Sequence, residues 1–561
     1  MSLTPFTSPR HPRWAWLLAA GLLLLPAAWN GLPLMYPDTP TYLRGAEAGL
    51  VRLLGPGRLP TWLDEAPAAS AVPGPTTASA GPQGGEGAAL PPKSPGRAAG
   101  LSAPQEGVVL AGRSIYYGAL LEASQLAGSL WWAVALQALC LAWLMHLLLV
   151  TRWGLPTPAF LAIAGLLALA TPAGLFTGLL MPDIFAGLAI LASALLMAEG
   201  KALRTGQRIG VALLLLFALC AHASHLATAA LLLALGTGWA IWNAWTTRAA
   251  RSSWAAPPAW RARGTRGPWA GGLAWVAACV VGALLAEAAF SRVVTQALGA
   301  PPLRLPHLTA RLVDQGPGTA YLNQVCPELA PDERWAACNY RDRFPLPWTD
   351  FLFEPDPARG VFAPADAATK RRLSQEQIGL AWRVLRHDPA GVLGDMAADT
   401  ARQLTEFRID IWGLGPRELA MYEGRVPSAL MAALRDSRGA RAPQWQDRFS
   451  ALALASTGAG ALLLLGYLVW HGRRGAEARE VATCLVTLVL AGLVMNAAVC
   501  AALAAPLDRF QARVVWLLPL LGAGLCARAA LLRAAAAPPR MPGWPAHAAQ
   551  VRTRKPQGAQ P

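Results

Sequence analysis

The chain has 561 residues, of which 54% are hydrophobic and only 14% are charged, and its mean hydropathy is +0.35. Soluble proteins carry about 25% charged residues, so this composition excludes a soluble globular protein. The net charge of +16 comes without zinc-ligand spacing or a basic and aromatic stripe, which argues against nucleic acid as a partner.

Ten apolar stretches approach or exceed the roughly 20 residues that cross a bilayer as a helix. They predict an all-α polytopic membrane protein with about ten transmembrane helices. The stretches are 14–32, 129–151, 156–172, 183–199, 208–222, 225–245, 269–290, 449–470, 481–503 and 514–534. The third and the fifth are short and each is followed closely by another, so each pair is either a tight hairpin or includes a re-entrant helix.

The basic residues predict how these helices are oriented. Arg10 and Arg13 precede the first stretch, and further basic residues gather in alternate short connections and in the tail. Because basic loops stay in the cytoplasm, we expect both termini there. The first stretch also has the features of a signal peptide, but we expect an uncleaved anchor because many spans follow.

Arginine, alanine, glycine and proline are abundant while lysine is scarce. This bias is typical of GC-rich bacterial genomes, so the expected location is the bacterial cytoplasmic (inner) membrane. The predicted divisions are a cytoplasmic N-terminus with the first span (1–32), an extracytoplasmic loop (33–128), spans two to seven (129–290), an extracytoplasmic domain (291–448), spans eight to ten (449–534) and a basic cytoplasmic tail (535–561).

The loop at 33–128 has two patterned ends and an unpatterned middle. Apolar residues at helical spacing predict an interfacial helix over 41–54, and apolar periodicity resumes over 107–127. The segment 64–107 between them is rich in Pro, Gly, Ala and Ser. Such a segment buries too little apolar area to fold, so we expect a disordered insertion.

The region 291–448 is long enough for a core of its own. Its apolar spacing predicts helices around 305–314, 373–387 and 391–407, so we expect a mainly helical domain inserted before the last three spans.

Two cysteines of this domain, Cys326 and Cys338, differ from the other six, which lie in apolar stretches and suit packing. An oxidising compartment favours a disulfide between Cys326 and Cys338. The alternative is a pair of buried free thiols.

Asp38 follows the first predicted span, in the sequence Met35-Tyr36-Pro37-Asp38-Thr39-Pro40. The two prolines restrict the backbone on both sides of it. A carboxylate that is partly desolvated at the membrane boundary is expected to have a raised pKa and to suit a general base. The alternative is an ordinary solvated loop residue.

A second Pro-Asp pair, Pro182-Asp183, stands at a later exit on the same predicted side. Asp183 is either a catalytic group or the N-cap of the fourth span.

His222 and His225 also lie at this surface, and they share a face if the segment is helical. They suit a phosphate or, with an aspartate, a divalent metal; a polar turn is the alternative.

Arg509 and Arg513 break the positive-inside pattern at the start of the last span. They are four residues apart, so they share one helical face, and guanidinium groups suit a lipid phosphate. The alternative is an internal pair with Asp508. No nucleotide-binding or nucleophile-elbow motif is found in the chain.

This layout resembles the GT-C superfamily of membrane glycosyltransferases, which use polyprenyl-phosphate sugars. The resemblance covers roughly residues 14–290 and is carried by Pro37-Asp38-Thr39-Pro40 and Met181-Pro182-Asp183. The chain departs from the family pattern in two ways. Its soluble domain precedes the last three spans, and its first loop has a single acidic residue without an acidic neighbour.

The resemblance implies that a sugar is transferred from a polyprenyl-phosphate donor to an envelope glycan or lipid acceptor at the outer face of the membrane. Asp38 would deprotonate the acceptor, and Asp183 would assist it or bind a metal. The remaining candidates would hold the donor phosphate: His222, His225, Arg509 and Arg513. No cofactor is required by this chemistry, although a divalent metal stays open.

Two other functions fit the composition. A transporter or flippase of lipid-linked substrates predicts charged or broken-helix sites near the bilayer midplane, or internal repeats; midspan charges are few and no repeat is found. The other is a non-catalytic envelope assembly protein whose soluble domain binds a partner.

Overall fold

The computed structural model describes residues 14–55, 57–62, 113–252, 270–409, 415–442, 444–472 and 477–536. The segment 64–107, Arg10, Arg13 and residues 537–561 lie outside these ranges. Within them the chain is all-α: no strand is present, and the one β-bridge joins Leu34 to Leu179.

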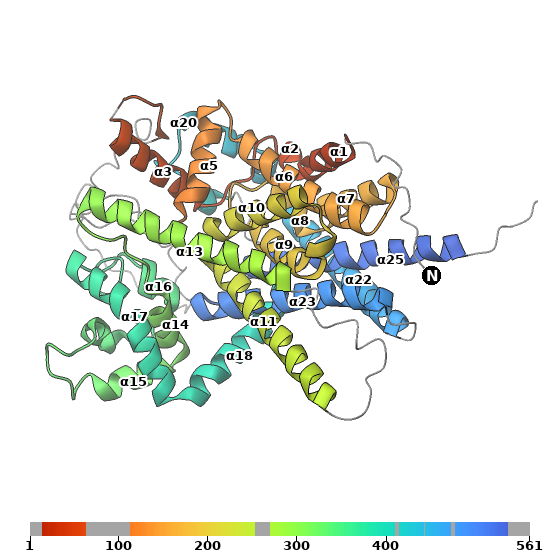
Figure 1. Cartoon of the computed structure of the whole chain (residues 1–561). Helices are drawn as coiled ribbons and strands as arrows, with labels where there is room; N and C mark the ends of the chain where they lie inside the picture. Colours follow the sequence, from red (N-terminus) through yellow and green to blue (C-terminus); the bar gives the residue numbers. More distant parts are fainter. Residues whose placement is uncertain are drawn as a thin grey trace, which may run out of the picture.

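The helices fall into a main bundle and an inserted region (Figure 1). The bundle and its flanking helices are α1 (Trp14–Leu23), α2 (Leu25–Asn30), α3 (Thr39–Leu54), α5 (Ile115–Leu126), α6 (Trp131–His146), the π-helical turn η1 (Leu147–Arg152), α7 (Thr157–Ala170), α8 (Pro172–Thr177), α9 (Ile184–Glu199), the 3₁₀ turn η2 (Gly200–Ala202), α10 (Thr205–Ala221), α11 (Ala223–Ser252), α13 (Ala270–Leu298), α22 (Trp445–Gly472), α23 (Glu477–Leu503), α24 (Asp508–Val515) and α25 (Leu517–Ala536). The inserted region has α14 (His307–Gln315), α15 (Pro317–Val325), the 3₁₀ helix η3 (Ala336–Arg343), α16 (Trp348–Phe353), α17 (Ala367–His387), α18 (Pro389–Thr405), α19 (Pro416–Ala420), α20 (Ser428–Asp436) and α21 (Arg438–Arg441).

Seven helical segments of the described residues are long and apolar enough to cross a membrane: Trp131–Arg152, Ile184–Ala202, Ala223–Thr246, Gly271–Ala297, Trp445–Trp470, Thr483–Leu503 and Asp508–Ala535. Three shorter apolar helices, α1, α7 and α10, stand where the sequence predicts further spans. The structure thus supports an all-α membrane protein with seven candidate spans, while the total of ten crossings stays a prediction.

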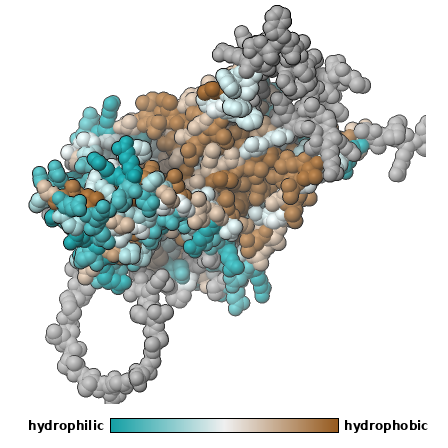
Figure 2. Space-filling view, turned by 90° about the horizontal axis from the view of Figure 1, so that it is seen from below, coloured by the Kyte–Doolittle hydropathy of each residue, from teal (hydrophilic) through white to brown (hydrophobic). Residues whose placement is uncertain are grey.

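The surface of the bundle agrees with a membrane setting. Large apolar side chains are more than half exposed on several of its helices: Leu213 (61%), Trp242 (59%), Leu285 (65%) and Leu462 (72%). A continuous apolar surface of this kind is unfavourable in water and suits lipid. Figure 2 shows this apolar surface over the bundle, with hydrophilic residues gathered at one end of the molecule.

The inserted region has a hydrophobic core of its own, which extends from Leu305 to Val392. The disulfide between Cys326 and Cys338 lies in it, with the two Cα atoms 5.6 Å apart. From Ile409 onward, buried apolar residues such as Tyr422 and Met431 belong instead to the main core. The last part of the insertion therefore packs on the bundle.

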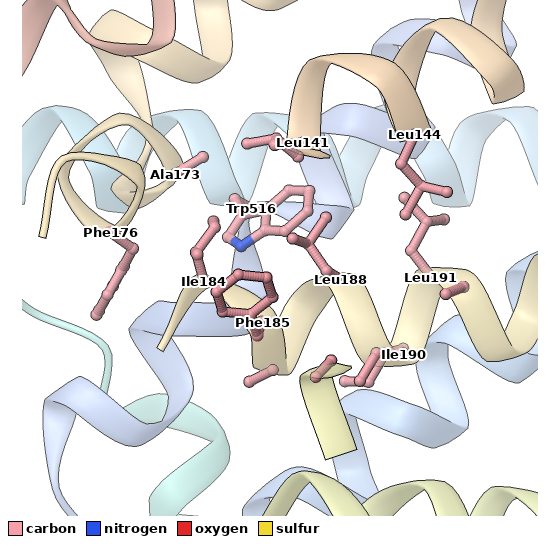
Figure 3. Packing of buried hydrophobic residues seen from close by; sticks show 14 of the residues in the cluster. Leu141, Leu144, Ala173, Phe176, Ile184, Phe185, Leu188, Ile190, Leu191 and Trp516 are labelled. Carbon is pink, nitrogen blue, oxygen red and sulfur yellow. The ribbon is translucent and has the colours of Figure 1, made fainter. Parts of the chain in front are cut away.

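The joint between α24 and α25 is fixed in the main core by one side chain. Trp516 is fully buried among Ile184, Phe185 and Leu188 of α9 (Figure 3). Its indole fits only because α9 has Gly187 there: a Cβ at that position would lie 2.5 Å from the ring. The indole N–H also donates to the carbonyl of Arg513 at 2.8 Å, so the packing sets the end of α24.

The loop before α3 is tied to the turn before α9. The N–H of Leu34 donates to Gly178 at 2.8 Å, and the N–H of Leu180 donates to Leu34 at 2.9 Å. The Thr39 hydroxyl adds a hydrogen bond to the Leu180 carbonyl at 3.0 Å. Since Asp38 precedes Thr39 and Asp183 follows this turn, these bonds bring the two carboxylates into one region.

Candidate functional site

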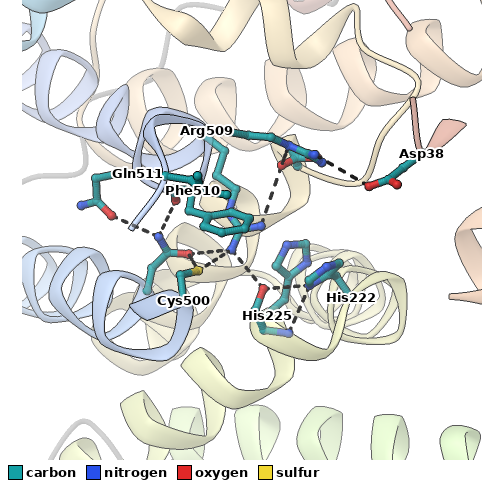
Figure 4. A network of polar contacts seen from close by, with 12 residues as sticks. Asp38, His222, His225, Cys500, Arg509, Phe510 and Gln511 are labelled. Carbon is teal, nitrogen blue, oxygen red and sulfur yellow. Dashed lines mark hydrogen bonds and ion pairs between the residues drawn. The ribbon is translucent and has the colours of Figure 1, made fainter. Parts of the chain in front are cut away.

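The six residues singled out from the sequence lie close together, and Figure 4 labels four of them: Asp38, His222, His225 and Arg509. Asp38 precedes α3, Asp183 precedes α9, and Arg509 and Arg513 lie on α24. His222 lies between α10 and α11, and His225 lies in the first turn of α11. The contacts described below join all six into one network.

Asp183 and Arg509 form its buried centre. Arg509 Nε donates to Asp183 Oδ1 at 3.0 Å, and Arg509 Nη2 donates to Oδ2 at 2.6 Å. The Asp183 side chain is only 2% exposed, and this two-point pairing holds the buried carboxylate in its ionised form.

The structure does not show the alternative roles of these two residues, which were a side-chain cap for Asp183 and an ion pair with Asp508 for Arg509. Asp183 occupies the N-cap position of α9, but its side chain makes no cap hydrogen bond. Arg509 pairs with Asp183 and not with Asp508. The Asp508 carboxylate instead accepts from the backbone N–H of Arg408 at 2.6 Å.

Arg513 is the second buried arginine, 2% exposed. Its Nη1 lies 3.8 Å from Asp183 Oδ1, and its Nη2 donates to Asn496 Oδ1 and to Ser224 Oγ, at 3.0 Å in both cases. Its Nη2 also lies 3.2 Å from the sulfur of Cys500, a residue that the sequence assigns to packing. Arg513 therefore joins α9, α11 and α23 at one point.

Asp38 differs from Asp183 in being accessible: its side chain is 28% exposed. It pairs with Arg113, whose Nη2 lies 2.6 Å from Asp38 Oδ2. Arg509 Nη1 approaches the same oxygen to 4.0 Å, and its guanidinium carbon lies 4.0 Å from the centre of the Tyr36 ring.

The expected raised pKa of Asp38 is wrong. Burial acts to raise the pKa of this carboxyl, but the positive charges of Arg113 and Arg509 outweigh burial and hold the pKa below its ordinary value. Desolvation alone predicts a raised pKa. The lowering depends on Arg113, which lies 75 positions after Asp38, beyond the Pro- and Gly-rich segment 64–107.

The two histidines have opposite tautomers in their neutral forms. The N–H of Ser224 donates to His222 Nδ1 at 3.2 Å, so the proton of His222 is on Nε2. His225 Nδ1 lies 2.9 Å from the carbonyl oxygen of Ala218, which only accepts, so the proton of His225 is on Nδ1. His225 Nε2 is then a buried acceptor without a hydrogen-bond partner among the described residues.

The two imidazole rings lie 5.2 Å apart, centre to centre. Burial, followed by the neighbouring His225 and the charges of Arg513 and Arg113, lowers the pKa of His222 well below its ordinary value. His222 is therefore neutral at pH 7 and offers an Nε2–H donor without a positive charge.

The inserted region supplies supports that the sequence did not reveal. Gln403 of α18 holds both backbone groups of Leu507: its side-chain Oε1 accepts from the N–H at 2.9 Å and its Nε2 donates to the carbonyl at 2.8 Å. Arg425 donates to Thr41 of α3 at 2.7 Å. No local sequence pattern indicates these contacts, because the partners are more than 100 positions apart.

The donor set does not fit a divalent metal. Among the described residues, no three His, Cys, Asp or Glu side chains are grouped in a way that would hold an ion. Asp183 is already paired with Arg509, and Asp38 with Arg113. We therefore derive no chemical step through a metal.

An apolar cavity of about 370 Å³ lies between α6, α9 and α10. It is lined by Leu136, Cys140, Trp143, Phe185, Gly210, Leu214 and Phe217. Phe185 follows Asp183 by two residues, and its ring contacts Phe217 at 5.0 Å between centres. The cavity lining therefore reaches the first turn of α9, the helix that Asp183 precedes.

Comparison with known proteins returned no match: no family model, curated protein or solved structure is significantly similar to this chain.

Proposed function

We propose that the chain is a membrane glycosyltransferase that transfers a sugar from a polyprenyl-phosphate donor to an envelope acceptor at the outer face of the bacterial inner membrane. The observation that carries this proposal is the pair of unlike aspartates. Asp38 is 28% exposed while Asp183 is 2% exposed and held by Arg509. One carboxylate is thus available to a substrate, and the other organises the arginines.

In this proposal Asp38 is the general base for the acceptor hydroxyl. A sugar on a lipid phosphate already has a good leaving group, so the enzyme must orient the hydroxyl, accept its proton and stabilise the departing phosphate. Asp38 is ionised at neutral pH because Arg113 and Arg509 hold its pKa low. It is therefore always in the form that accepts a proton.

The donor phosphate is proposed to bind near Arg509 Nη1 and His222 Nε2. Nε and Nη2 of Arg509 are occupied by Asp183, which leaves Nη1 facing Asp38 at 4.0 Å. Arg513 and His225 lie deeper and orient these groups, through Ser224 and through the facing imidazole ring. The proposal thus divides the four predicted phosphate ligands into two that contact substrate and two that position them.

The apolar cavity supports a donor with a hydrocarbon chain. Its lining includes Phe185, two residues after Asp183, and it lies between helices that are candidate membrane spans or short apolar helices. A polyprenyl chain in the cavity would keep its phosphate close to the arginines.

The test is sugar transfer by purified protein that carries Asp38→Asn. General bases contribute about 10²–10⁴-fold to rate, so we expect the transfer rate to fall at least about 100-fold while the protein remains folded in detergent. Asp436→Asn is the matched control, since Asp436 is 76% exposed and pairs only with Arg441 on the surface. An Asp38→Asn variant that transfers sugar at the control's rate refutes the proposal.

A further inference from the structure

Three arginines from separate parts of the chain lie along the start of α3: Arg113 contacts Asp38, Arg425 contacts Thr41, and Arg44 follows Thr41 by three positions on the same helix. Arg44 lies on α3, Arg113 precedes α5, and Arg425 lies between α19 and α20 of the inserted region. Asp38 is the carboxylate paired with Arg113 at 2.6 Å. Arg425 donates to the hydroxyl of Thr41, and among the described residues neither Arg44 nor Arg425 has a carboxylate within ion-pair distance.

The nearest carboxylates in the sequence face other partners. Glu47 of α3 accepts from the backbone N–H of Trp62 at 2.6 Å. Glu423, two positions before Arg425, pairs with Arg435 at 2.8 Å. The charge of Asp38 acts on both Arg113 and Arg425, while Arg44 and Arg425 make no ion pair within the described part of the chain.

Two observations show that these three arginines are not fully solvated. All three arginine side chains are partly buried, and the Nε atom of Arg44 is buried without a hydrogen-bond partner. Burial lowers the pKa of Arg425, and the charges of Arg44 and Arg113 lower it further against the opposing effect of Asp38. Like charges held together in this way are stabilised when an anion binds between them.

We propose that Arg44, Arg113 and Arg425 form a second anion site, which binds a phosphate group carried by the acceptor. This inference deepens the proposed function: the assignment of the phosphate to an acceptor rests on that function, whereas the anion site itself depends only on the arginines. Arg509 contacts Asp38 from the donor group of residues and Arg113 contacts the same oxygen from the second group. Asp38 therefore stands where both substrates would meet.

A bound phosphate would also change Asp38. The charges of Arg113 and Arg425 lower the pKa of this carboxyl, and a phosphate between them would cancel part of that effect. The carboxylate would then become a stronger base once the acceptor is in place. The inserted region takes part in this step because it supplies Arg425.

The test measures the binding of dihexanoyl phosphatidic acid to the purified full chain in detergent, with dihexanoylglycerol as the probe that lacks phosphate. We expect Arg44→Gln and Arg425→Gln each to weaken phosphatidic acid binding about 10-fold, the loss of one charge-assisted contact. Arg425→Lys is expected to restore most of the affinity, and Asp38→Asn to tighten binding because it removes the competing carboxylate. Arg435→Gln, an exposed arginine on α20, is the matched control.

Equal binding of phosphatidic acid by the wild type, Arg44→Gln and Arg425→Gln overturns the anion site, and so does equal binding of dihexanoylglycerol. Competition by inorganic phosphate distinguishes the two sources of the anion. If inorganic phosphate displaces phosphatidic acid at an equal concentration, the site binds free phosphate. If it displaces phosphatidic acid only weakly, the site binds a lipid phosphate. Arginine-dependent binding without any sugar transfer by the wild type would retain the anion site and remove the proposed function.

Discussion

At the scale of single residues, the two aspartates differ in their surroundings, and their substitution is therefore expected to have different effects. Asp183 is enclosed with Arg509, whereas Asp38 keeps contact with solvent while paired with Arg113. Substitution of either residue by asparagine removes one charge of an ion pair. The consequence depends on how deeply the remaining arginine is buried.

For Asp183→Asn we expect a large loss of stability. The substitution leaves Arg509 buried without its partner, and breaking a buried pair in this way costs about 3–5 kcal/mol. The checking measurement is the temperature at which the detergent-solubilised protein aggregates, compared with Asp436→Asn. A variant as stable as this control would show that the pair does not hold the site together.

If Asp38 is the general base as proposed, the pH dependence of transfer reports its ionisation. The pKa of this carboxyl is lower in the folded protein than its ordinary value of about 3.9. Asp38 is therefore ionised, and stabilises the fold, at every pH above that ordinary value. The stabilisation is lost only as the pH falls through the lower pKa of the folded protein. We expect kcat/KM, which reports the pKa values of the free enzyme, to stay constant from pH 8 down to pH 5. A decline centred near pH 6 in the wild type that is absent in Asp38→Asn would contradict this assignment.

Much of the charged site could be predicted from single residues, but its connections could not. An acid, an imidazole or a guanidinium group at a membrane boundary is costly unless paired, which is why Asp183, His222 and Arg513 stand out in the sequence. Their partners are set by the fold: the pair between Asp183 and Arg509 spans 326 positions and the contact between Arg425 and Thr41 spans 384. Without the arginines around it, the pKa of Asp38 could only be predicted from desolvation, and the predicted direction was wrong.

At the scale of helices, α9 contributes residues to the charged site, to the apolar cavity and to the packing of Trp516. It holds Asp183 at its start, Phe185 against the cavity and Gly187 against Trp516. The apolar periodicity predicts such a helix, but not the use of a glycine for close packing.

Gly187→Ala is expected to disturb α24 without touching any charged group. A Cβ at this position would lie 2.5 Å from the Trp516 ring, so the indole must shift, and overpacking of this kind costs about 1–3 kcal/mol. We expect a lower aggregation temperature and slower transfer together. Gly165→Ala on α7, where a Cβ meets nothing within 4 Å, is the control, and equal behaviour of the two variants would rule out the packing role of Gly187.

Leu214→Trp tests whether the cavity between α6, α9 and α10 holds the donor chain. The larger side chain would fill space that the chain needs, and each buried methylene group contributes about 0.8 kcal/mol. We expect KM for a long polyprenyl-phosphate donor to rise about 10-fold or more, with little change for a donor of one or two isoprene units. Leu213→Trp, on the neighbouring exposed position of α10, should leave both values unchanged. A similar KM in the two variants would exclude the cavity as the chain site.

At the scale of the whole molecule, the fold places an inserted helical region against the charged end of a membrane bundle. The run of apolar stretches predicts the bundle well because each helix must satisfy its own backbone in lipid. The sequence also indicates the disulfide and the main helices of the insertion. It does not indicate that residues from Ile409 onward leave the core of the insertion and pack with the bundle, because apolar spacing specifies a buried face and not its partner.

The predicted orientation can be checked in intact cells. Ile378 on α17 is 71% exposed, and Arg204 lies exposed in the connection before α10. We expect Ile378→Cys to react with a membrane-impermeant maleimide added outside the inner membrane, and Arg204→Cys to react only after that membrane is opened, each compared with the unmodified chain. The reverse pattern would place the charged site in the cytoplasm and exclude a reaction at the outer face.

The most direct measurement is the release of polyprenyl phosphate by the protein reconstituted in vesicles with a polyprenyl-phosphate sugar and extracted envelope acceptors. The wild type and Asp436→Asn should release one polyprenyl phosphate for each sugar that appears on an acceptor, and Asp38→Asn should release almost none. Sugar that crosses the bilayer still attached to its lipid, with no release by the wild type, would contradict sugar transfer and identify movement of the intact lipid instead.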